Sequence, residues 1–349
     1  MPSPARVILA GYGLAGEIFH APFIAAQPGL ELATIVTRDP QRAANARAAY
    51  PGVRIAEDAE AAMPGHDLLV VATVNRVHRS LAAAGLDAGL HVVVDKPVAV
   101  TAADAADLEQ LARRRGRLLI PFHNRRWDAE FLTLRRLLQD GTLGDPVRIE
   151  SRFCRWRPDP KPHVWRESAD PADGGGLLLD LGTHLVDQCV ALLGAPERVY
   201  GEVTRRRPGA GPDDDVFIAL GYPGGATAHV WASAFAADAG PRLRVLGTRA
   251  AYVNPHLDGQ EDALRAGVRP GDGRPWGVEP ESRWGEVVAG DERRPVPSEP
   301  GDWPAFYAGV AAAVRDGAPP PVDAADAVTV LRVLEAARSS AAQSAVVRL

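Results

Sequence analysis

Residues 5–19, ARVILAGYGLAGEIF, decide the expected fold of this chain. A short apolar run from Val7 to Ala10 is typical of a buried strand, and Gly11-x-Gly13-x-x-Gly16 and a helix-compatible run follow it. In such a strand–turn–helix, the first glycine makes the tight turn and the second lets the backbone approach a pyrophosphate. The third lets the helix pack closely on the strand. The alternative, a glycine-rich turn without a ligand, is disfavoured by the sequence that follows.

Strands and helices alternate from this turn to about residue 122. Such alternation indicates a doubly wound parallel sheet, whose ligands bind beyond the carboxyl ends of the strands. We therefore expect an N-terminal Rossmann domain that covers residues 1–122 and binds a dinucleotide. The runs typical of strands lie at 30–37, 66–74, 91–98 and 117–122, and those compatible with helices lie at 40–51, 75–90 and 102–116.

The expected contacts of the dinucleotide lie at those carboxyl ends. His78, in the next helix, is expected to be a surface or supporting histidine, and His20 is expected to be structural or exposed. The expected cofactor contacts are Gly11, Tyr12, Gly13, Leu14, Ala15, Gly16, Thr37, Arg38, Thr73, Asn75, Asp95, Lys96, Pro97 and Asn124.

The end of the second strand selects the form of the cofactor. Enzymes that use NAD usually place a carboxylate there, which binds the 2′-hydroxyl of the ribose. Here Thr37 and Arg38 take that position, and a hydroxyl with a guanidinium suits a 2′-phosphate. The alternative is that the Asp39 carboxylate binds the ribose 2′-hydroxyl, although we expect Asp39 to cap the helix that begins at Pro40. NADP is therefore the preferred cofactor and NAD the alternative.

The pattern changes after residue 122. Period-two alternation predicts strands whose sheet has one less buried face. We expect a C-terminal α+β domain, residues 123–349, with an open, mostly antiparallel mixed sheet. Its expected strands lie at 146–156, 197–206, 215–222, 226–233 and 242–254, its helices at about 127–139, 174–193, 302–317 and 323–343, and an irregular excursion at 256–302.

A lysine and an aspartate–histidine pair are candidate catalytic residues. Of the 39 basic residues only Lys96 and Lys161 are lysines. A lysine can be tuned to release its proton whereas an arginine cannot, so Lys96, after an apolar strand, is a candidate; Lys161, in a proline-rich loop, is typical of a solvated charge. In GLLLDLGTHLVDQ, 176–188, one helix would present Asp180 and His184 on one face. The alternative is that Asp180 caps the helix and His184 is a buried structural histidine.

The order of these motifs resembles the Gfo/Idh/MocA oxidoreductases over essentially the whole chain. The resemblance rests on Gly11-x-Gly13-x-x-Gly16, then Asp95-Lys96-Pro97, then Gly174-Gly175-Gly176 with Asp180-x-x-x-His184. The stretches 11–24, 122–138 and 182–194 look closest to the NADP-dependent scyllo-inositol 2-dehydrogenase subgroup. The family's lysine motif usually begins with Glu, so Asp95 shortens that carboxylate by one methylene. The resemblance implies a Rossmann domain plus a mixed α/β domain whose open sheet makes oligomer contacts.

An enzyme that moves a hydride between a secondary alcohol and nicotinamide must also move the hydroxyl proton. We expect His184 to be the general base in oxidation, Asp180 to bind a substrate hydroxyl and favour the imidazolium, and Lys96 to polarise the oxygen. The roles of Lys96 and His184 could be exchanged. Trp165 and Arg166 are expected to line the substrate pocket, and Arg125 and Arg126 either contact ligand or tie the domains together.

Composition sets the remaining expectations. A net charge of -5 and a pI near 6.0 give no case for nucleic acid or anionic membrane as a partner. No apolar run reaches the length of a membrane-spanning helix, and the early first strand leaves no room for a signal peptide. Cys154 and Cys189 have no metal-type spacing. We expect a cytoplasmic homodimer or homotetramer without metal.

The expected function is oxidation or reduction of a cyclic polyol or sugar. One alternative is a sensor or repressor that binds NAD(P) on the same fold without catalysis, and retention of Lys96, Asp180 and His184 argues against it. The other alternative is reduction of a non-sugar ketone, imine or dihydrodiol.

Overall fold

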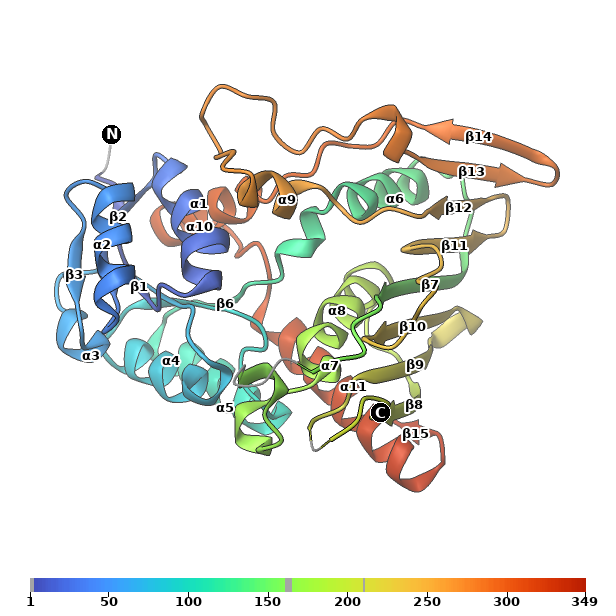
Figure 1. Ribbon diagram of the computed structural model, residues 1–349, viewed down its shortest axis with the longest axis horizontal. Coiled ribbons are helices and arrows are strands. Elements are labelled where there is room, and N and C mark those ends of the chain that lie inside the picture. Colours follow the sequence, from blue (N-terminus) through green and yellow to red (C-terminus); the bar gives the residue numbers. More distant parts are fainter. Residues whose placement is uncertain (1–2, 161–164, 210) are drawn as a thin grey trace. The chain divides into compact units, whose positions relative to one another are not determined.

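The computed structural model describes residues 3–160, 165–209 and 211–349, and it forms two compact units (Figure 1). The first unit comprises residues 1–124, 261–274 and 303–328, and the second comprises 125–260, 275–302 and 329–349. The main change of unit after residue 124 lies close to the division expected at residue 122. Two later segments that return to the first unit were not expected from the sequence.

The first unit contains a six-stranded parallel sheet with the order β3-β2-β1-β4-β5-β6. This is the Rossmann order, with its topological switch between β1 and β4, so the ends of these two strands are where a dinucleotide binds. Its central strands are buried on both faces, which accounts for their continuous apolar runs. The strands are β1 (Ala5–Ala10), β2 (Leu30–Val36), β3 (Arg54–Ala56), β4 (Leu68–Val71), β5 (His91–Val94) and β6 (Leu119–Pro121).

The helices of the first unit begin and end where the sequence provides caps. The Asp39 carboxylate accepts hydrogen bonds from the first backbone N–H groups of α2, and Thr101 caps α5, which ends at Gly116 with a positive φ of 62°. These helices are π-helix η1 (Ala15–His20), α1 (Ala21–Ala26), α2 (Pro40–Ala49), α3 (Ala59–Ala62), 3₁₀-helix η2 (Asn75–Val77), α4 (His78–Asp87), α5 (Ala102–Arg115) and α10 (Pro304–Asp316).

The second unit contains a nine-stranded mixed sheet with the order β14-β13-β12-β11-β7-β10-β9-β8-β15. Only β7 and β10 pair in parallel among the described strands, so the expected open, mostly antiparallel sheet is confirmed. The strands are β7 (Pro146–Cys154), β8 (Arg198–Thr204), β9 (Asp215–Gly221), β10 (Thr227–Ser233), β11 (Leu243–Gly247), β12 (Ala251–Asn254), β13 (Gly285–Ala289), β14 (Glu292–Val296) and β15 (Val347–Arg348).

Helices of the second unit lie on one face of this sheet (Figure 1). Helix α8 packs on β7 and β10, and α11 approaches β8 so closely that a Cβ on Gly201 would lie 2.4 Å from the carbonyl oxygen of Ala337. The helical segments that belong wholly or mainly to this unit are η3 (Asn124–Trp127), α6 (Ala129–Gln139), η4 (Trp165–Glu167), η5 (Pro171–Asp173), α7 (Leu177–Asp180), α8 (Gly182–Leu193), η6 (Pro223–Gly225), η7 (Glu281–Arg283) and α11 (Ala324–Gln343). Helix α9 (Gln260–Arg265) belongs to the first unit except for its first residue.

The single helix expected over 174–193 is wrong, because the chain bends by 58° between Asp180 and Gly182. The Asp213 carboxylate accepts a hydrogen bond from Leu178 N and fixes the start of α7, and α8 then starts in a new direction after Leu181. Among the described residues no single helix is both long and apolar enough to cross a membrane, although this bent pair together has that length and composition. In this structure α8 is a buried core helix.

The irregular excursion expected over 256–302 is only partly irregular. It contains α9 and the antiparallel hairpin of β13 and β14, and that hairpin extends the sheet beyond β12. The polar strand β14 carries Glu, Arg and Pro, as an edge strand commonly does, and this composition hid it from periodicity arguments.

Candidate active site

The glycine-rich turn after β1 leaves no space for two of its glycines to carry a side chain. Gly11 has a φ of +100°, and a Cβ there would lie 2.3 Å from the carbonyl oxygen of Ala72. A Cβ on Gly16 would lie 2.0 Å from the carbonyl oxygen of Gly11, because the helix starts directly against the turn. The fold itself therefore requires glycine at both positions.

Gly13 is different, because nothing in the protein crowds it. The nearest atom to a Cβ there is Nη1 of Arg42, at 3.6 Å, which is ordinary contact. The fold does not need glycine at this position, but close approach of a pyrophosphate to the backbone does. The turn thus fits a dinucleotide, with Leu14 exposed and Ala15 starting the helical segment η1.

Tyr12 lies inside the same turn and is buried. Burial raises the pKa of Tyr12 to about 12, with Glu17 adding to the increase and Arg269 opposing it. The Tyr12 hydroxyl therefore keeps its proton at neutral pH. Arg269 comes from the returning segment 261–274, so a side chain from far along the chain contributes positive charge beside the turn.

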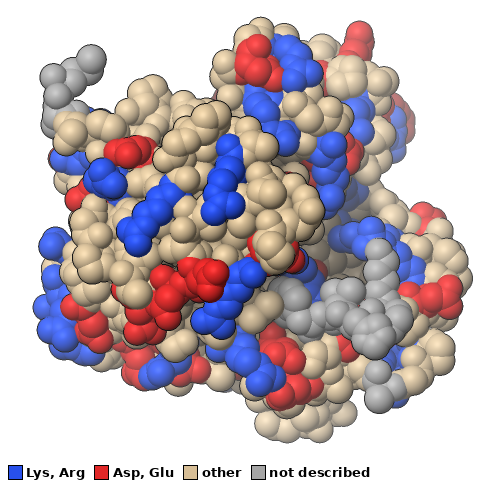
Figure 2. Space-filling view, turned by 60° about the vertical axis from the view of Figure 1, so that its left-hand side comes forward, with Lys and Arg blue, Asp and Glu red and all other residues tan. Residues whose placement is uncertain are grey.

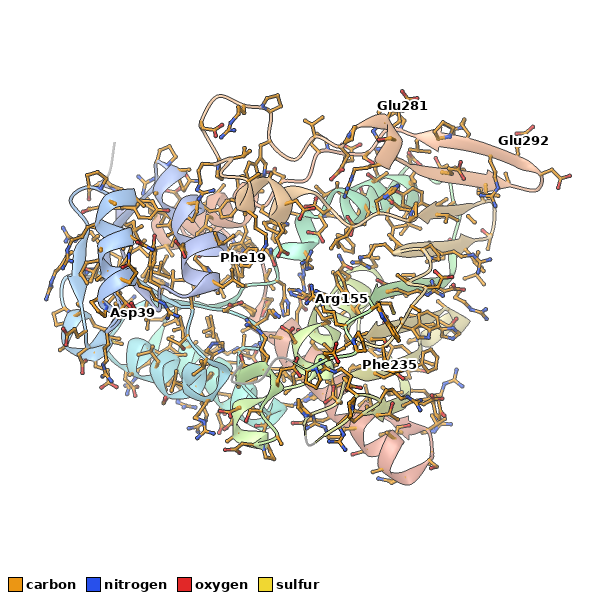
Figure 3. All side chains as sticks on the ribbon, viewed as in Figure 1. Phe19, Asp39, Arg155, Phe235, Glu281 and Glu292 are labelled. Carbon is orange, nitrogen blue, oxygen red and sulfur yellow. The ribbon has the colours of Figure 1, made fainter. Side chains whose placement is uncertain are left out.

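The end of β2 carries the expected pair Thr37 and Arg38. The strand ends at Val36, and Arg38 donates from Nε to the carbonyl oxygen of Glu57 at 3.2 Å. The prediction that Asp39 caps α2 is confirmed, since its Oδ1 accepts from the N–H groups of Gln41 and Arg42 at 2.9 and 3.0 Å (Figure 3). A carboxylate committed to the helix is less suited to binding a ribose hydroxyl.

Arg42 is a candidate cofactor residue that the sequence argument missed. Its guanidinium lies opposite Gly13 and 3.7 Å from the Asp39 carboxylate, in the first turn of α2. The available signal was a second arginine four positions after Arg38, on the helix that follows the strand end.

The ends of β4 and β5 are joined by a buried histidine. His78 lies within hydrogen-bond distance of the carbonyl oxygen of Pro97 through Nδ1, at 2.8 Å, and of that of Thr73 through Nε2, at 3.3 Å. Burial lowers the pKa of His78, and the contact with Pro97 opposes that effect. The imidazole supports both loops, so the supporting role expected for His78 fits, whereas a surface position does not. Asn75, one of the expected contacts, is buried in the same loop.

Asp95, Lys96 and Pro97 form a tight turn after β5. The backbone N–H of Lys96 donates to Oδ1 of Asp95 at 2.7 Å, and the peptide bond before Pro97 is cis. Lys96 is half-buried, at the carboxyl edge of the parallel sheet. The turn therefore holds the lysine backbone at the edge where ligands of this fold bind.

The segment after β6 is bound to helix α8 by its arginines. Arg126 and Asp187 form a buried ion pair with an Nη2–Oδ1 distance of 2.6 Å, and the amide of Gln188 donates to the carbonyl oxygen of Arg125 at 2.9 Å. Both contacts lie within the second unit, so they anchor this segment to α8 and do not tie the two units together. Asn124, the last residue of the first segment of the first unit, is buried.

Asp180 and Arg166 lie together in the second unit. Nε of Arg166 is 3.5 Å from Oδ1 of Asp180, and the carbonyl oxygen of Arg166 accepts from the N–H of Gly176. A Cβ on Gly176 would lie 2.4 Å from the Asp213 carboxylate, so the glycine there is needed for the close passage that precedes α7. The side chain of Trp165, and the residues Lys161 and His163, lie outside what the structure describes.

His184 lies in the first turn of α8, and it is 6% exposed. Its ring centroid is 6.4 Å from that of Phe153 on β7, edge to face. The shared helical face expected for Asp180 and His184 is corrected, because Asp180 ends α7 and His184 belongs to the next helix. The two residues still lie on either side of one bend, three positions from Leu181 at most.

The expected site residues thus form two groups. The glycine turn, the ends of β2 and β4, the lysine turn and Asn124 belong to the first unit, and Arg166, Asp180 and His184 belong to the second. Within the described part of the chain, no three His, Cys, Asp or Glu side chains are arranged to hold a metal ion. Basic and acidic side chains are interspersed over the face seen in Figure 2.

Comparison with known proteins matches both units to one family. A model of the oxidoreductase family with NAD-binding Rossmann fold (GFO_IDH_MocA) matches residues 5–123, and the GFO/IDH/MocA C-terminal domain matches residues 131–253. The solved structure of yvaA from Bacillus subtilis has a TM-score of 0.93 and 31% identity, covering 100% of this chain and 99% of its own.

Two curated relatives span nearly the whole chain. The uncharacterized oxidoreductase YdgJ of Escherichia coli (strain K12) is 39% identical over 345 residues, 98% of this chain and 97% of the relative. The scyllo-inositol 2-dehydrogenase (NADP(+)) IolW of Bacillus subtilis (strain 168) is 32% identical over 350 residues, which are 99% of this chain and 96% of the relative. Because identity to YdgJ is higher, these relatives support the family rather than the inositol subgroup. The chain belongs to the Gfo/Idh/MocA family and is an NAD(P)-binding oxidoreductase.

Proposed function

We propose that this protein is an NADP-preferring dehydrogenase that acts on a secondary alcohol of a cyclic polyol or sugar. The observation that carries the proposal is the position of Lys96, in a tight turn at the carboxyl edge of a Rossmann sheet whose glycine turn fits a pyrophosphate. The activity printed for IolW, a relative along almost its whole length, supports the substrate class.

The residues divide the chemistry between them. When bound, the nicotinamide accepts or supplies the hydride. In the oxidation direction His184 takes the hydroxyl proton, and Lys96 donates a hydrogen bond to the same oxygen and stabilises the developing negative charge. Asp180, held near Arg166, binds a neighbouring hydroxyl and favours the protonated imidazole. The roles of Lys96 and His184 as proton carrier and electrostatic partner are exchangeable in this scheme.

The preference for NADP rests on the end of β2. Arg38 and Arg42 provide two guanidinium groups near the strand end, and the competing acid Asp39 is engaged in capping α2. A dianionic 2′-phosphate gains charge-assisted hydrogen bonds from such groups, whereas a ribose hydroxyl gains little.

We also propose a homodimer or homotetramer built on the sheet of the second unit. The face without the helices carries half-buried aromatic side chains, and Phe217 and Trp231 pair across β9 and β10 with centroids 5.1 Å apart. The guanidinium of Arg152 lies 4.1 Å above the Trp231 ring. A self-complementary contact between two copies would cover this face.

A substrate screen tests the proposed activity. Cyclic polyols and sugars are each incubated with NADP and with NAD, and absorbance of the reduced cofactor is followed. The proposal expects turnover with at least one cyclic polyol or sugar, faster with NADP. Tight cofactor binding without reduction by any member of the panel would contradict it and favour a sensor.

A further inference from the structure

Two buried histidines contact the two residues that flank Lys96, one on each side of it. His78 lies against the carbonyl oxygen of Pro97, after the lysine, and His20 lies against the Asp95 carboxylate, before it. The proposed chemistry assigns neither residue a role.

His20 is the last residue of the π-helix η1, which follows the glycine turn. Its side chain is 0% exposed, and its ring lies on Phe122 with centroids 4.2 Å apart. Nδ1 is 2.6 Å from the hydroxyl of Tyr307, a residue of α10 that is also fully buried. Nε2 is 3.9 Å from Oδ2 of Asp95, which is an electrostatic contact rather than a hydrogen bond. π-helical turns of this kind are frequent at functional sites.

The tyrosine sets the tautomer of this histidine. Burial raises the pKa of Tyr307 well above its ordinary value, and the Asp95 charge adds to that, so its hydroxyl keeps its proton. We take the hydroxyl as the donor to Nδ1, because His20 is its one hydrogen-bond partner among the described residues. An imidazole that accepts at Nδ1 carries its proton on Nε2. The N–H of Nε2 therefore faces the Asp95 carboxylate.

The two oxygens of the Asp95 carboxylate have different neighbours, one in a hydrogen bond and one in an electrostatic contact. Oδ1 accepts from the backbone N–H of Lys96, and Oδ2 faces His20. Burial favours the neutral acid, but His20, then Lys96 and His78, outweigh it and lower the pKa of Asp95 to about 2. Together with the Tyr307 hydroxyl, these are the titratable groups that face this carboxylate, from η1, α4, α10 and its own turn.

We propose that His20, oriented by the Tyr307 hydroxyl, is a positioning residue that fixes the Asp95 carboxylate and thereby sets the orientation and proton affinity of Lys96. Without the His20 N–H, Oδ2 is released to turn toward the Lys96 ammonium. A closer carboxylate stabilises the ammonium form and makes the lysine a poorer proton donor. The consequence for turnover rests on the proposed function, whereas the effect on Lys96 does not.

The chain offers a direct readout of Lys96, because it has only two lysines. Reductive methylation with ¹³C-formaldehyde keeps their positive charge and gives one NMR signal for each lysine and one for the amino terminus. Lys96→Arg assigns the signals, and Lys161 serves as internal reference. Each signal is titrated with pH, without substrate or turnover.

The variants form a graded series. His20→Leu should raise the titration midpoint of Lys96 by about half a pH unit or more, which is the scale of a strengthened charge pair. Tyr307→Phe, which removes one oxygen, should raise it less. His20→Gln, whose amide N–H can replace the N–H of Nε2, should stay near the wild type. Tyr222→Phe is the matched control, because the Tyr222 hydroxyl is also buried and has no hydrogen-bond partner among the described residues.

An unchanged Lys96 midpoint in both His20→Leu and Tyr307→Phe would overturn the proposal, as would equal shifts in Tyr222→Phe. If His20→Leu does not fold, the proposal is decided by comparing the Lys96 midpoint in Tyr307→Phe with that in Tyr222→Phe. Where turnover is found, kcat should fall in the same order while the Kd for NADP changes less than about twofold. A protein without any turnover would contradict the proposed function and still allow this test.

Discussion

Lys96 and His184 should each be essential for turnover and dispensable for folding. Lys96→Arg keeps the charge but removes the transferable proton, and His184→Ala removes the proposed base. Each should lower kcat by about a hundredfold or more, the usual scale for a positioned acid or base. Asp180→Asn should also lower kcat, since it removes the charge that favours the imidazolium.

The control for these variants is cofactor binding. None of the three residues belongs to the glycine turn, so all three variants should still bind NADP. The double variant of Lys96 and His184 should lose less than the sum of the two single losses, because residues that act as a unit are not additive. Near-normal kcat in both single variants would return Asp180 and His184 to a structural role.

Arg38 and Arg42 should determine preference for the 2′-phosphate. Arg38→Ala or Arg42→Ala should weaken the binding of NADP by roughly 1.5–3 kcal/mol, which is the range for a hydrogen bond to a charged group. The binding of NAD should be nearly unchanged. Arg47→Ala, an exposed arginine in the last turn of the same helix, is the matched control. The Kd values are measured by fluorescence titration. An equal loss of affinity for both cofactors would reject the assignment of these arginines to the 2′-phosphate.

Residue chemistry could be predicted where it depended on nearby sequence. The capping role of Asp39 follows from Asp-Pro before a helix, and the candidacy of Lys96 follows from its place after an apolar strand. The contact between His20 and Tyr307 could not be predicted, because 287 positions separate them and only the return of 303–328 to the first unit brings them together.

At the scale of elements, α6 buries a carboxyl that should make stability depend on pH. Glu130 is 2% exposed, and its Oε1 is 3.4 Å from Nε of Arg242. Burial raises the pKa of Glu130 from 4.5 to about 8, with Asp128 adding to the increase and Arg242 opposing it. Between these values the folded chain binds more protons than the unfolded chain, so the free energy of unfolding falls as pH rises from about 4.5 to about 8.

Glu130→Gln should remove this part of the pH dependence. The neutral amide resembles the protonated acid, so the fall in Tm between pH 5.5 and pH 8.5 should be smaller than in the wild type. Glu292→Gln, at an exposed position on β14, should leave the fall unchanged (Figure 3). Equal falls in the wild type and Glu130→Gln would show that Glu130 is ionised throughout.

The elements show where periodicity is a sufficient guide and where it is not. Five of the six parallel strands are mainly apolar runs bounded by turns, and these could be located from sequence. The short strand β3, Arg54–Ala56, was not expected, because its residues are only half-buried or exposed. The bend at Leu181 could not, because the apolar spacing of Leu178, Leu181 and Leu185 continues through it. The start of α7, the helix before the bend, is held by a hydrogen bond from Leu178 N to Asp213, which lies beyond the whole of β8.

At the scale of the whole molecule, the aromatic face of the nine-stranded sheet should hold two copies together. Trp231→Glu would place a charge in that contact and should convert the dimer or tetramer into a smaller species at micromolar concentration. Val278→Glu is the control, because Val278 is apolar and 63% exposed but belongs to the loop before η7 and β13 and not to a strand of the sheet. Light scattering that finds a monomer for the wild type would remove the assembly proposal.

The two-unit organisation was predictable in outline, from the change of strand–helix alternation to period-two alternation after residue 122. The returns of 261–274 and 303–328 to the first unit were not, because nothing in the sequence of these segments marks the unit to which they belong. The periodicity of apolar residues likewise carries no information about which substrate the protein binds.

Transfer of deuterium tests the central claim most directly. Cyclic polyols and sugars deuterated at their ring carbinol carbons are incubated with NADP, and the cofactor is recovered and examined by mass spectrometry and NMR. The account predicts one deuterium at C4 of the nicotinamide per turnover, with wild-type protein and not with His184→Ala. Bound NADP that acquires no deuterium from any substrate in the panel would contradict it.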